Sequence, residues 1–241
     1  MHLKFTEIIN KSMKLNEIIW KTATSGVELL ASIKNGKFTI DGSKLKVDGD
    51  FYCYNNKLTS LEGAPASVGV SFYCYNNELT SLKGAPYSVG VNFSCHNNEL
   101  ISLEGAPSSV GGNFSCGENK LTSLKGAPSS VGGTLFCNNN KLTSLEGAPS
   151  SVGRNFSCHN NELTSLSTIH KIIKEVRGYM NFEDNPIKSS VLGLVKIKGL
   201  TNVIFDNKKL EKIMNKYLPL GDIFDCQEEL IEAGLEEFAE L

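Results

Sequence analysis

Residues 72–90 read FYCYNNELTSLKGAPYSVG, and this pattern returns every 21 residues between positions 51 and 166. A fixed period of this length is typical of solenoids, in which each copy forms one coil and stacks on the next. A single copy buries too little apolar surface to offset its backbone entropy, so neighbouring copies must complete its core. Six copies are present, beginning at Phe51, Phe72, Phe93, Phe114, Leu135 and Phe156.

The first half of each copy alternates two kinds of position. Phe72 and Cys74 alternate with Tyr73 and Tyr75, and a period of two predicts a strand with one buried face. We expect the phenylalanine and cysteine side chains to point inward and the tyrosines to point outward. The second half holds a Gly-Ala-Pro run and a Val-Gly pair, which predict irregular turns that bring the chain back. Strands of successive copies should pair in parallel, about 4.8 Å apart.

One asparagine and one cysteine also recur at fixed positions. Each asparagine is expected to bond backbone groups where the strand ends, in its own coil and in the next. The asparagines are Asn56, Asn77, Asn98, Asn119, Asn140 and Asn161. The cysteines, Cys53, Cys74, Cys95, Cys116, Cys137 and Cys158, keep the repeat spacing instead of forming a disulfide framework. They lie along a line and do not converge as zinc ligands do, so we interpret them as core thiols.

The run Phe-x-Cys-x-x-Asn-x-Leu-x-x-Leu resembles the leucine-rich-repeat family, with Phe and Cys where leucine is usual. The short unit is similar to that of bacterial secreted effectors, and more so to the Gly-Ala-Pro, Cys-bearing repeats of bacteriophage-encoded proteins. The resemblance covers residues 51–166. It implies a leucine-rich-repeat solenoid with a curved parallel β-sheet on the concave face and irregular convex turns, to which the flanking sequences add α-helical terminal caps. It further implies a binding role and a phage or prophage origin.

The flanks are expected to cover the ends of the stacked core. We assign residues 1–50 to an N-terminal helical and hairpin cap and residues 51–166 to six leucine-rich repeats. Residues 167–241 then form degenerate repeats and a C-terminal helical cap. Near the N-terminus the pattern predicts an amphipathic helix at 3–20 and a hairpin at Lys34-Asn35-Gly36-Lys37.

The C-terminal flank continues the repeat in weaker form. Residues 180–187 read as a seventh rung with Asn185 at the asparagine position, and residues 200–207 as an eighth strand. Helices are expected at 168–176, 190–196 and 208–217. The segment 222–241 has eight acidic residues and no basic one, which favours a capping helix with a solvated acidic side; a docking helix is the alternative. Its expected apolar face consists of Leu230, Ile231, Leu235, Phe238 and Leu241.

The outward strand positions vary more than the inward ones, as a recognition surface requires. One column reads Tyr52, Tyr73, Ser94, Ser115, Phe136 and Ser157; the next reads Tyr54, Tyr75, His96, Gly117, Asn138 and His159. Solvent-facing tyrosines favour an interface, although aromatic residues also stack along a ladder without any partner. The candidate partner-binding residues are Tyr52, Tyr54, Tyr73, Tyr75, His96, Phe136, Asn138 and His159.

Composition narrows the possible functions. The net charge of −2 gives no basic field for nucleic acid, and no apolar stretch approaches the roughly 18 residues that a membrane span needs. Free thiols and the absence of an export signal favour a cytoplasmic location, in the host cytoplasm if the protein is phage-encoded. Nucleotide-binding and serine-elbow motifs are absent, and Cys226, flanked by Asp225 and Glu228, is a poor nucleophile.

We therefore expect a protein without enzymatic activity, cofactor or metal, which binds and modulates a host protein. Two alternatives remain open. A sponge for a nucleotide or a signalling metabolite would use the tyrosines to stack a base, but nearby Arg and Lys are too scarce to hold phosphates. A structural or assembly component would use the acidic tail or an end of the array for homotypic contacts.

Overall fold

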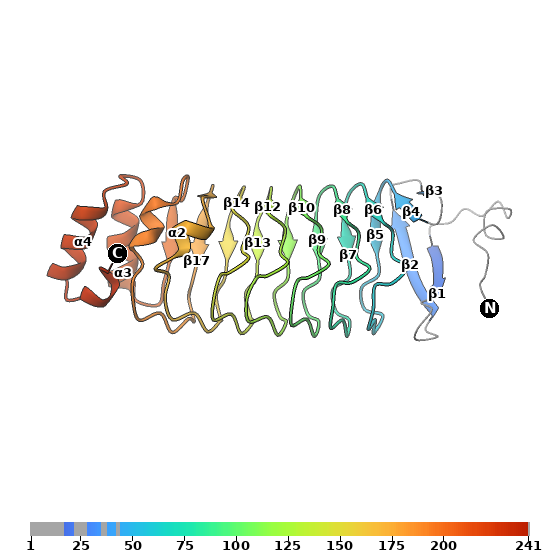
Figure 1. Ribbon diagram of the computed structural model, residues 1–241, viewed down its shortest axis with the longest axis horizontal. Coiled ribbons are helices and arrows are strands. Elements are labelled where there is room, and N and C mark those ends of the chain that lie inside the picture. The colour runs from blue at the N-terminus through green and yellow to red at the C-terminus, as the bar shows by residue number, and fades with distance from the viewer. Residues whose placement is uncertain (1–16, 22–27, 35–37, 42–43, 241) are drawn as a thin grey trace.

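The computed structural model describes residues 17–21, 28–34, 38–41 and 44–240, with side chains from residue 45 onward. The chain forms a parallel β-solenoid of about eight coils, with helices at its C-terminal end. The coils stack along a nearly straight axis in the view of Figure 1. Two sheets run along this axis, because each coil contributes one strand to each.

The larger sheet, sheet A, contains the alternating strands that the repeat predicts. Its ten strands are parallel from β5 onward, and each strand pairs one full repeat further along, as Phe72 does with Phe93. In order they are β1 (Glu17–Lys21), β2 (Glu28–Lys34), β5 (Asp50–Tyr52), β7 (Phe72–Tyr73), β9 (Phe93–Ser94), β11 (Phe114–Ser115), β13 (Leu135–Phe136), β15 (Phe156–Ser157), β17 (Tyr179–Asn181) and β18 (Asn202–Ile204).

The second half of each coil is more regular than the sequence pattern predicts. Instead of irregular turns alone, it forms sheet B, whose eight strands are mostly two residues long. Each central strand is a Ser-Val pair with the valine buried, so valine gives the coil a second inward anchor. In order the strands are β16 (Glu175–Val176), β14 (Ser151–Val152), β12 (Ser130–Val131), β10 (Ser109–Val110), β8 (Ser88–Val89), β6 (Ser67–Val68), β4 (Lys44–Val47) and β3 (Phe38–Asp41).

The core between the sheets confirms the inward assignment. Phe72, Cys74, Leu79 and Leu82 have no exposed surface, and their counterparts in the other five repeats are at most 5% exposed. The rings of Phe51, Phe72, Phe93 and Phe114 stack with centroids 5.5 Å apart at each step. Burial of each such side chain contributes about 2 kcal/mol, and stacking lets every coil share that gain with its neighbours.

The recurring asparagine joins each coil to the one before it. Asn98 accepts a hydrogen bond from the Leu79 N–H at 3.0 Å and donates to the carbonyl oxygens of Cys74 and Cys95 at 3.1 and 3.0 Å. The sequence prediction placed the second set of bonds in the next coil; the structure places it in the preceding coil. The same pattern is made by Asn77, Asn119, Asn140, Asn161 and Asn185.

A glycine after each Ser-Val pair allows the coils to approach closely along sheet B. A Cβ atom on Gly132 would lie 2.1 Å from the carbonyl oxygen of Gly111, which is far inside van der Waals contact. The glycine is therefore required by the spacing of the coils. This column of glycines continues through Gly153, and the position one coil later is Arg177.

The N-terminal flank differs from its prediction. The helix expected at 3–20 is wrong for residues 17–20, which belong to β1 and pair antiparallel with β2; its earlier part lies outside the described residues. The hairpin expected at 34–37 is also not supported, because β2 pairs with β5 in sheet A whereas β3 pairs with β4 in sheet B. The chain thus changes sheets between Lys34 and Phe38.

The C-terminal flank follows its prediction more closely. The seventh and eighth strands form as β17 and β18, and the helix expected at 208–217 is confirmed as α3 (Lys208–Tyr217). The helix expected at 168–176 is limited to α2 (Ile169–Ile172), because Lys174 and Glu175 return to sheet B and bond the Ser150 carbonyl. The helix expected at 190–196 is the 3-10 helix η1 (Leu192–Lys196).

The acidic tail folds as α4 (Ile223–Glu232) followed by the 3-10 turn η2 (Glu236–Phe238). Leu230, Leu235 and Phe238 are buried as expected, whereas Ile231 is 48% exposed and does not belong to the buried face. The helix ends at Glu232, so the expected continuous helical face stops there, and Leu241 lies outside the described residues.

Side chains of α3 form hydrogen bonds with backbone groups at the last strand of sheet A. Asn215 accepts from the Val203 N–H at 2.7 Å and donates to the Val203 carbonyl at 2.9 Å, as a neighbouring strand would. Glu211 accepts from the Phe205 N–H at 2.9 Å. These contacts satisfy backbone groups of β18 and of Phe205, directly after it, that a ninth coil would otherwise bond.

The asparagine ladder predicts a large and position-specific loss of stability. Asn98→Ala removes an amide that bonds four backbone groups, and we expect the free energy of unfolding in urea to fall by about 3 kcal/mol. The matched control is Asn97→Gly, because Asn97 is exposed and has φ 51°, a conformation that glycine adopts freely. A loss below 1 kcal/mol for Asn98→Ala, or an equal loss in the control, would contradict this role.

Candidate functional site

The outer face of sheet A carries an ordered cluster of aromatic rings at its N-terminal end. We call Tyr52, Tyr54, Tyr73, Tyr75 and His96 the tyrosine–histidine stack. In one column the rings of Tyr52 and Tyr73 lie 5.1 Å apart and nearly parallel. In the other, Tyr54, Tyr75 and His96 stack at 4.6 Å per step. The columns meet edge to face, with Tyr52 and Tyr54 at 6.0 Å and 83°. The predicted patch is therefore assembled as expected.

The stack ends at His96 because the next coil has Gly117 in the same column. Asn138, one coil further, leans back toward that gap: a Cβ atom built on Gly117 would lie 3.2 Å from Asn138 Oδ1. Ser115 follows Ser94 in the other column, and Phe136, which is 36% exposed, comes next. On this face, small side chains at Ser115 and Gly117 therefore separate the tyrosine–histidine stack from the ring of Phe136.

The His96 ring is held in place by a serine two residues earlier in the same coil. The Ser94 hydroxyl lies 2.8 Å from His96 Nδ1, and Ser157 and His159 repeat the contact at 3.0 Å three coils later. Burial lowers the pKa of His96, while the Glu118 carboxylate opposes this shift. A serine nucleophile needs an accessible hydroxyl, but Ser94 is 7% exposed, so the pair fits a structural contact that fixes the ring.

The eight predicted contact residues share one sheet face but not one cluster. Tyr52, Tyr54, Tyr73, Tyr75 and His96 touch each other, as described. Phe136 and Asn138 lie two coils beyond His96, and His159 lies one coil further, with Asn138 and Glu183 as its column neighbours. The N-terminal group is thus the organised part of the predicted site.

The cysteine column is chemically protected. All seven cysteines are buried and free of disulfides. Burial raises the pKa of the Cys53 and Cys95 thiols far above the usual value, and it raises the pKa of Cys226 to about 12, with Glu229 and Asp222 adding to the effect. In the described part of the chain, no three His, Cys, Asp or Glu side chains are grouped as metal ligands would be.

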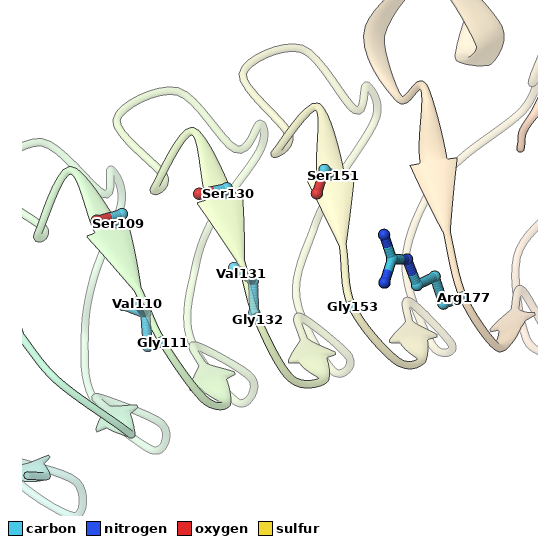
Figure 2. A pocket seen from close by; sticks show the side chains of 9 residues that line it. All are labelled: Ser109, Val110, Gly111, Ser130, Val131, Gly132, Ser151, Gly153 and Arg177. Carbon is cyan, nitrogen blue, oxygen red and sulfur yellow. The ribbon is translucent and has the colours of Figure 1, made fainter. Parts of the chain in front are cut away.

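Sheet B presents a second feature that the sequence analysis missed. A groove of about 420 Å³ crosses the strands β10, β12 and β14. Figure 2 shows the Arg177 side chain at its end, extending from the β16 coil toward β14. The groove is lined by Ser109, Val110, Gly111, Ser130, Val131, Gly132, Ser151, Gly153 and Arg177. The sequence signal that could have indicated this groove is the repeated Ser-Val-Gly run, which changes to Glu175-Val176-Arg177 in the seventh coil.

Comparison with known proteins gives no assignment of either face. The chain matches no protein-family model, no curated protein and no solved structure. In the described residues no helix combines the length and the apolar character that crossing a membrane would require. Any functional assignment therefore depends on the geometry of the two faces.

The buried thiols predict a chemical test of the packing. In native protein we expect no cysteine to react with 5,5′-dithiobis(2-nitrobenzoate) at pH 8 within minutes, because the reactive thiolate is both inaccessible and disfavoured. In guanidinium chloride all seven should react. Release of thionitrobenzoate from the native protein, measured at 412 nm, would contradict this packing, because it would show that at least one of the seven buried thiols opens to solvent.

The stacking of His96 predicts a shift in its titration. The pKa measured from the imidazole proton resonances should lie below 6.5, and Tyr75→Ala should raise it because the covering ring is removed. Since the folded pKa is the lower one, the unfolded chain binds this proton more readily, and His96 destabilises the fold as pH falls from about 6.5. Tyr54→Ala, one coil further away, is the control. An unchanged pKa in Tyr75→Ala would mean that the ring does not bury His96.

Proposed function

We propose that the chain is a non-enzymatic binding protein of leucine-rich-repeat type, whose sheet A outer face recognises a protein partner. In this proposal the terminal segments act as caps and the array presents the binding surface. Because the Cys-bearing repeat resembles those of bacteriophage-encoded proteins, we further propose a phage or prophage origin. The protein would then act in the host cytoplasm, where it binds and modulates a host protein.

The tyrosine–histidine stack is the observation that carries the proposal. Each ring is held by a neighbour on one or both faces, so its rotamer is restricted before any partner arrives. A rigid aromatic surface loses little conformational entropy on binding, which is why tyrosine is common at interfaces. The hydroxyl groups add polar contacts at the same positions.

A protein partner agrees with this geometry better than a nucleotide does. Ring faces within the stack cover each other at 4.6 to 5.1 Å, so a base cannot insert between them. Neither outward column contains a lysine or arginine that would hold a phosphate. The exposed ring edges and hydroxyl groups instead suit a broad contact with side chains and backbone.

The proposal predicts loss of partner binding in a variant that borrows residues from the array itself. Tyr52→Ser, Tyr73→Ser, Tyr54→Asn and Tyr75→Asn together install residues that later coils carry in the same columns. Because large aromatic anchors dominate interface energies, we expect Kd to rise by about 100-fold or more. Binding to a partner isolated from host lysate and identified by mass spectrometry would be measured by biolayer interferometry.

The control for this variant is Tyr87→Ser. Tyr87 is 59% exposed and lies next to sheet B, in the column that later coils fill with serine. It should leave Kd unchanged, and thermal unfolding should show both variants folded. Unaltered Kd in the four-site variant, or equal loss in Tyr87→Ser, would count against the outer face of sheet A as the interface.

A further inference from the structure

A cluster of cations gathers where the groove on sheet B ends. In the central coils the positions before and within the strands are Ser-Ser-Val-Gly, as in residues 150–153. The pairing of β14 with β16 replaces this run by Lys174-Glu175-Val176-Arg177 in the seventh coil. Lys198 follows in the eighth, since its N–H bonds the Lys174 carbonyl at 3.0 Å.

Electrostatic effects on two neighbouring groups show that these charges are close together. Burial lowers the pKa of His170, and Lys196, Lys171 and Lys174 lower it further. The hydrogen bond from Arg177 holds the pKa of Glu175 below its usual value, and Lys198 adds to this effect. Arg177 and Lys198 therefore lie near the Glu175 carboxylate, and Lys171, Lys174 and Lys196 lie near the His170 ring, in a chain whose net charge is −2.

Most of this positive charge has no internal counterion. Arg177 bonds Glu175 at 2.8 Å and remains 68% exposed at its side chain. Within residues 45–240, whose side chains are described, no ion pair joins a carboxylate to Lys171, Lys174, Lys196 or Lys198. The Lys174 ammonium group donates a hydrogen bond to the neutral His170 carbonyl at 3.0 Å, which leaves its charge unbalanced. Exposed cations grouped without carboxylate partners raise the local potential and attract anions.

The groove beside the cluster has the dimensions and the lining for an extended chain. It crosses three strands, which at about 4.8 Å per strand covers roughly 10 to 15 Å, the length of three to four extended residues. Glycines along its floor let another backbone approach, and the hydroxyls of Ser109, Ser130 and Ser151 can serve as donors or acceptors.

We propose that this groove binds an extended acidic peptide segment of a protein partner, with its carboxylates at the Arg177 end. An arginine guanidinium binds carboxylates through paired hydrogen bonds, and the lysines supply the surrounding positive field. A single-stranded nucleic acid is the less suitable occupant, because none of the lining residues is aromatic and bases need such platforms. The site is independent of the tyrosine–histidine stack.

The test uses defined probes with the full chain. Fluorescence anisotropy would compare a fluorescein-labelled hexaglutamate peptide with hexaglutamine and with a thymidine oligonucleotide of equal charge. We expect hexaglutamate to bind at least about tenfold more tightly than either of the other two, and more weakly as salt rises. Equal binding of the oligonucleotide, or no binding of hexaglutamate at low salt, would overturn the proposal.

Variants locate the site on the molecule. Arg177→Gly, Lys174→Ser and Lys198→Ser together restore residues of the central coils and should raise Kd at least about tenfold. Arg177→Gln alone should raise it severalfold if the triple variant does not fold. The matched control, Lys83→Ser, Lys125→Ser and Lys141→Ser, removes the same charge outside the groove and should change Kd less than about twofold.

A final variant separates the groove from charge alone. Ser130→Phe places a large side chain in the middle of the groove and leaves every cation in place. We expect it to weaken hexaglutamate binding about tenfold, with thermal unfolding confirming a folded protein. Full binding by Ser130→Phe would show that the cations act without the groove and would overturn the assignment of the site.

Discussion

The register between coils is the constraint on which the whole structure depends. Every coil must place its inward strand side chains and its asparagine directly over those of its neighbour, because each asparagine amide bonds two coils at once. A shift of one residue would turn the apolar side chains outward and leave these amides without partners. The constant 21-residue spacing is the sequence record of that requirement.

The sequence allowed correct prediction where a single local pattern determines the structure, as in the strands of sheet A. The alternation of Phe72, Tyr73, Cys74 and Tyr75 predicts which side chains point inward, and these are buried at every coil, although the outward residues Ser94 and Ser157 are buried as well. Stacking of Tyr75 on His96 follows from the same register. The ring geometry follows from the ladder, because aromatic side chains in register on neighbouring strands stack on one another.

Other features could not be predicted because the local signal was weak or tertiary contacts decided the outcome. Ser-Val is too short to identify as a strand, and it becomes one only because the same pair lies beside it in adjacent coils. A helix is expected over residues 168–176, yet the N–H groups of Lys174 and Glu175 bond the Ser150 carbonyl, and this end of the segment joins sheet B. The cation cluster was missed for the same reason. Only the fold shows that Arg177 occupies the position that Gly111, Gly132 and Gly153 hold in the preceding coils.

The side chains of Asn215 and Glu211 have a consequence for how the molecule can vary in size. They bond backbone groups of Val203 and Phe205 as a neighbouring strand would, and they lie outside the repeated unit. Whole 21-residue units could therefore be gained or lost by recombination without changing these contacts. Each duplicated unit would lengthen both sheet faces together by one coil.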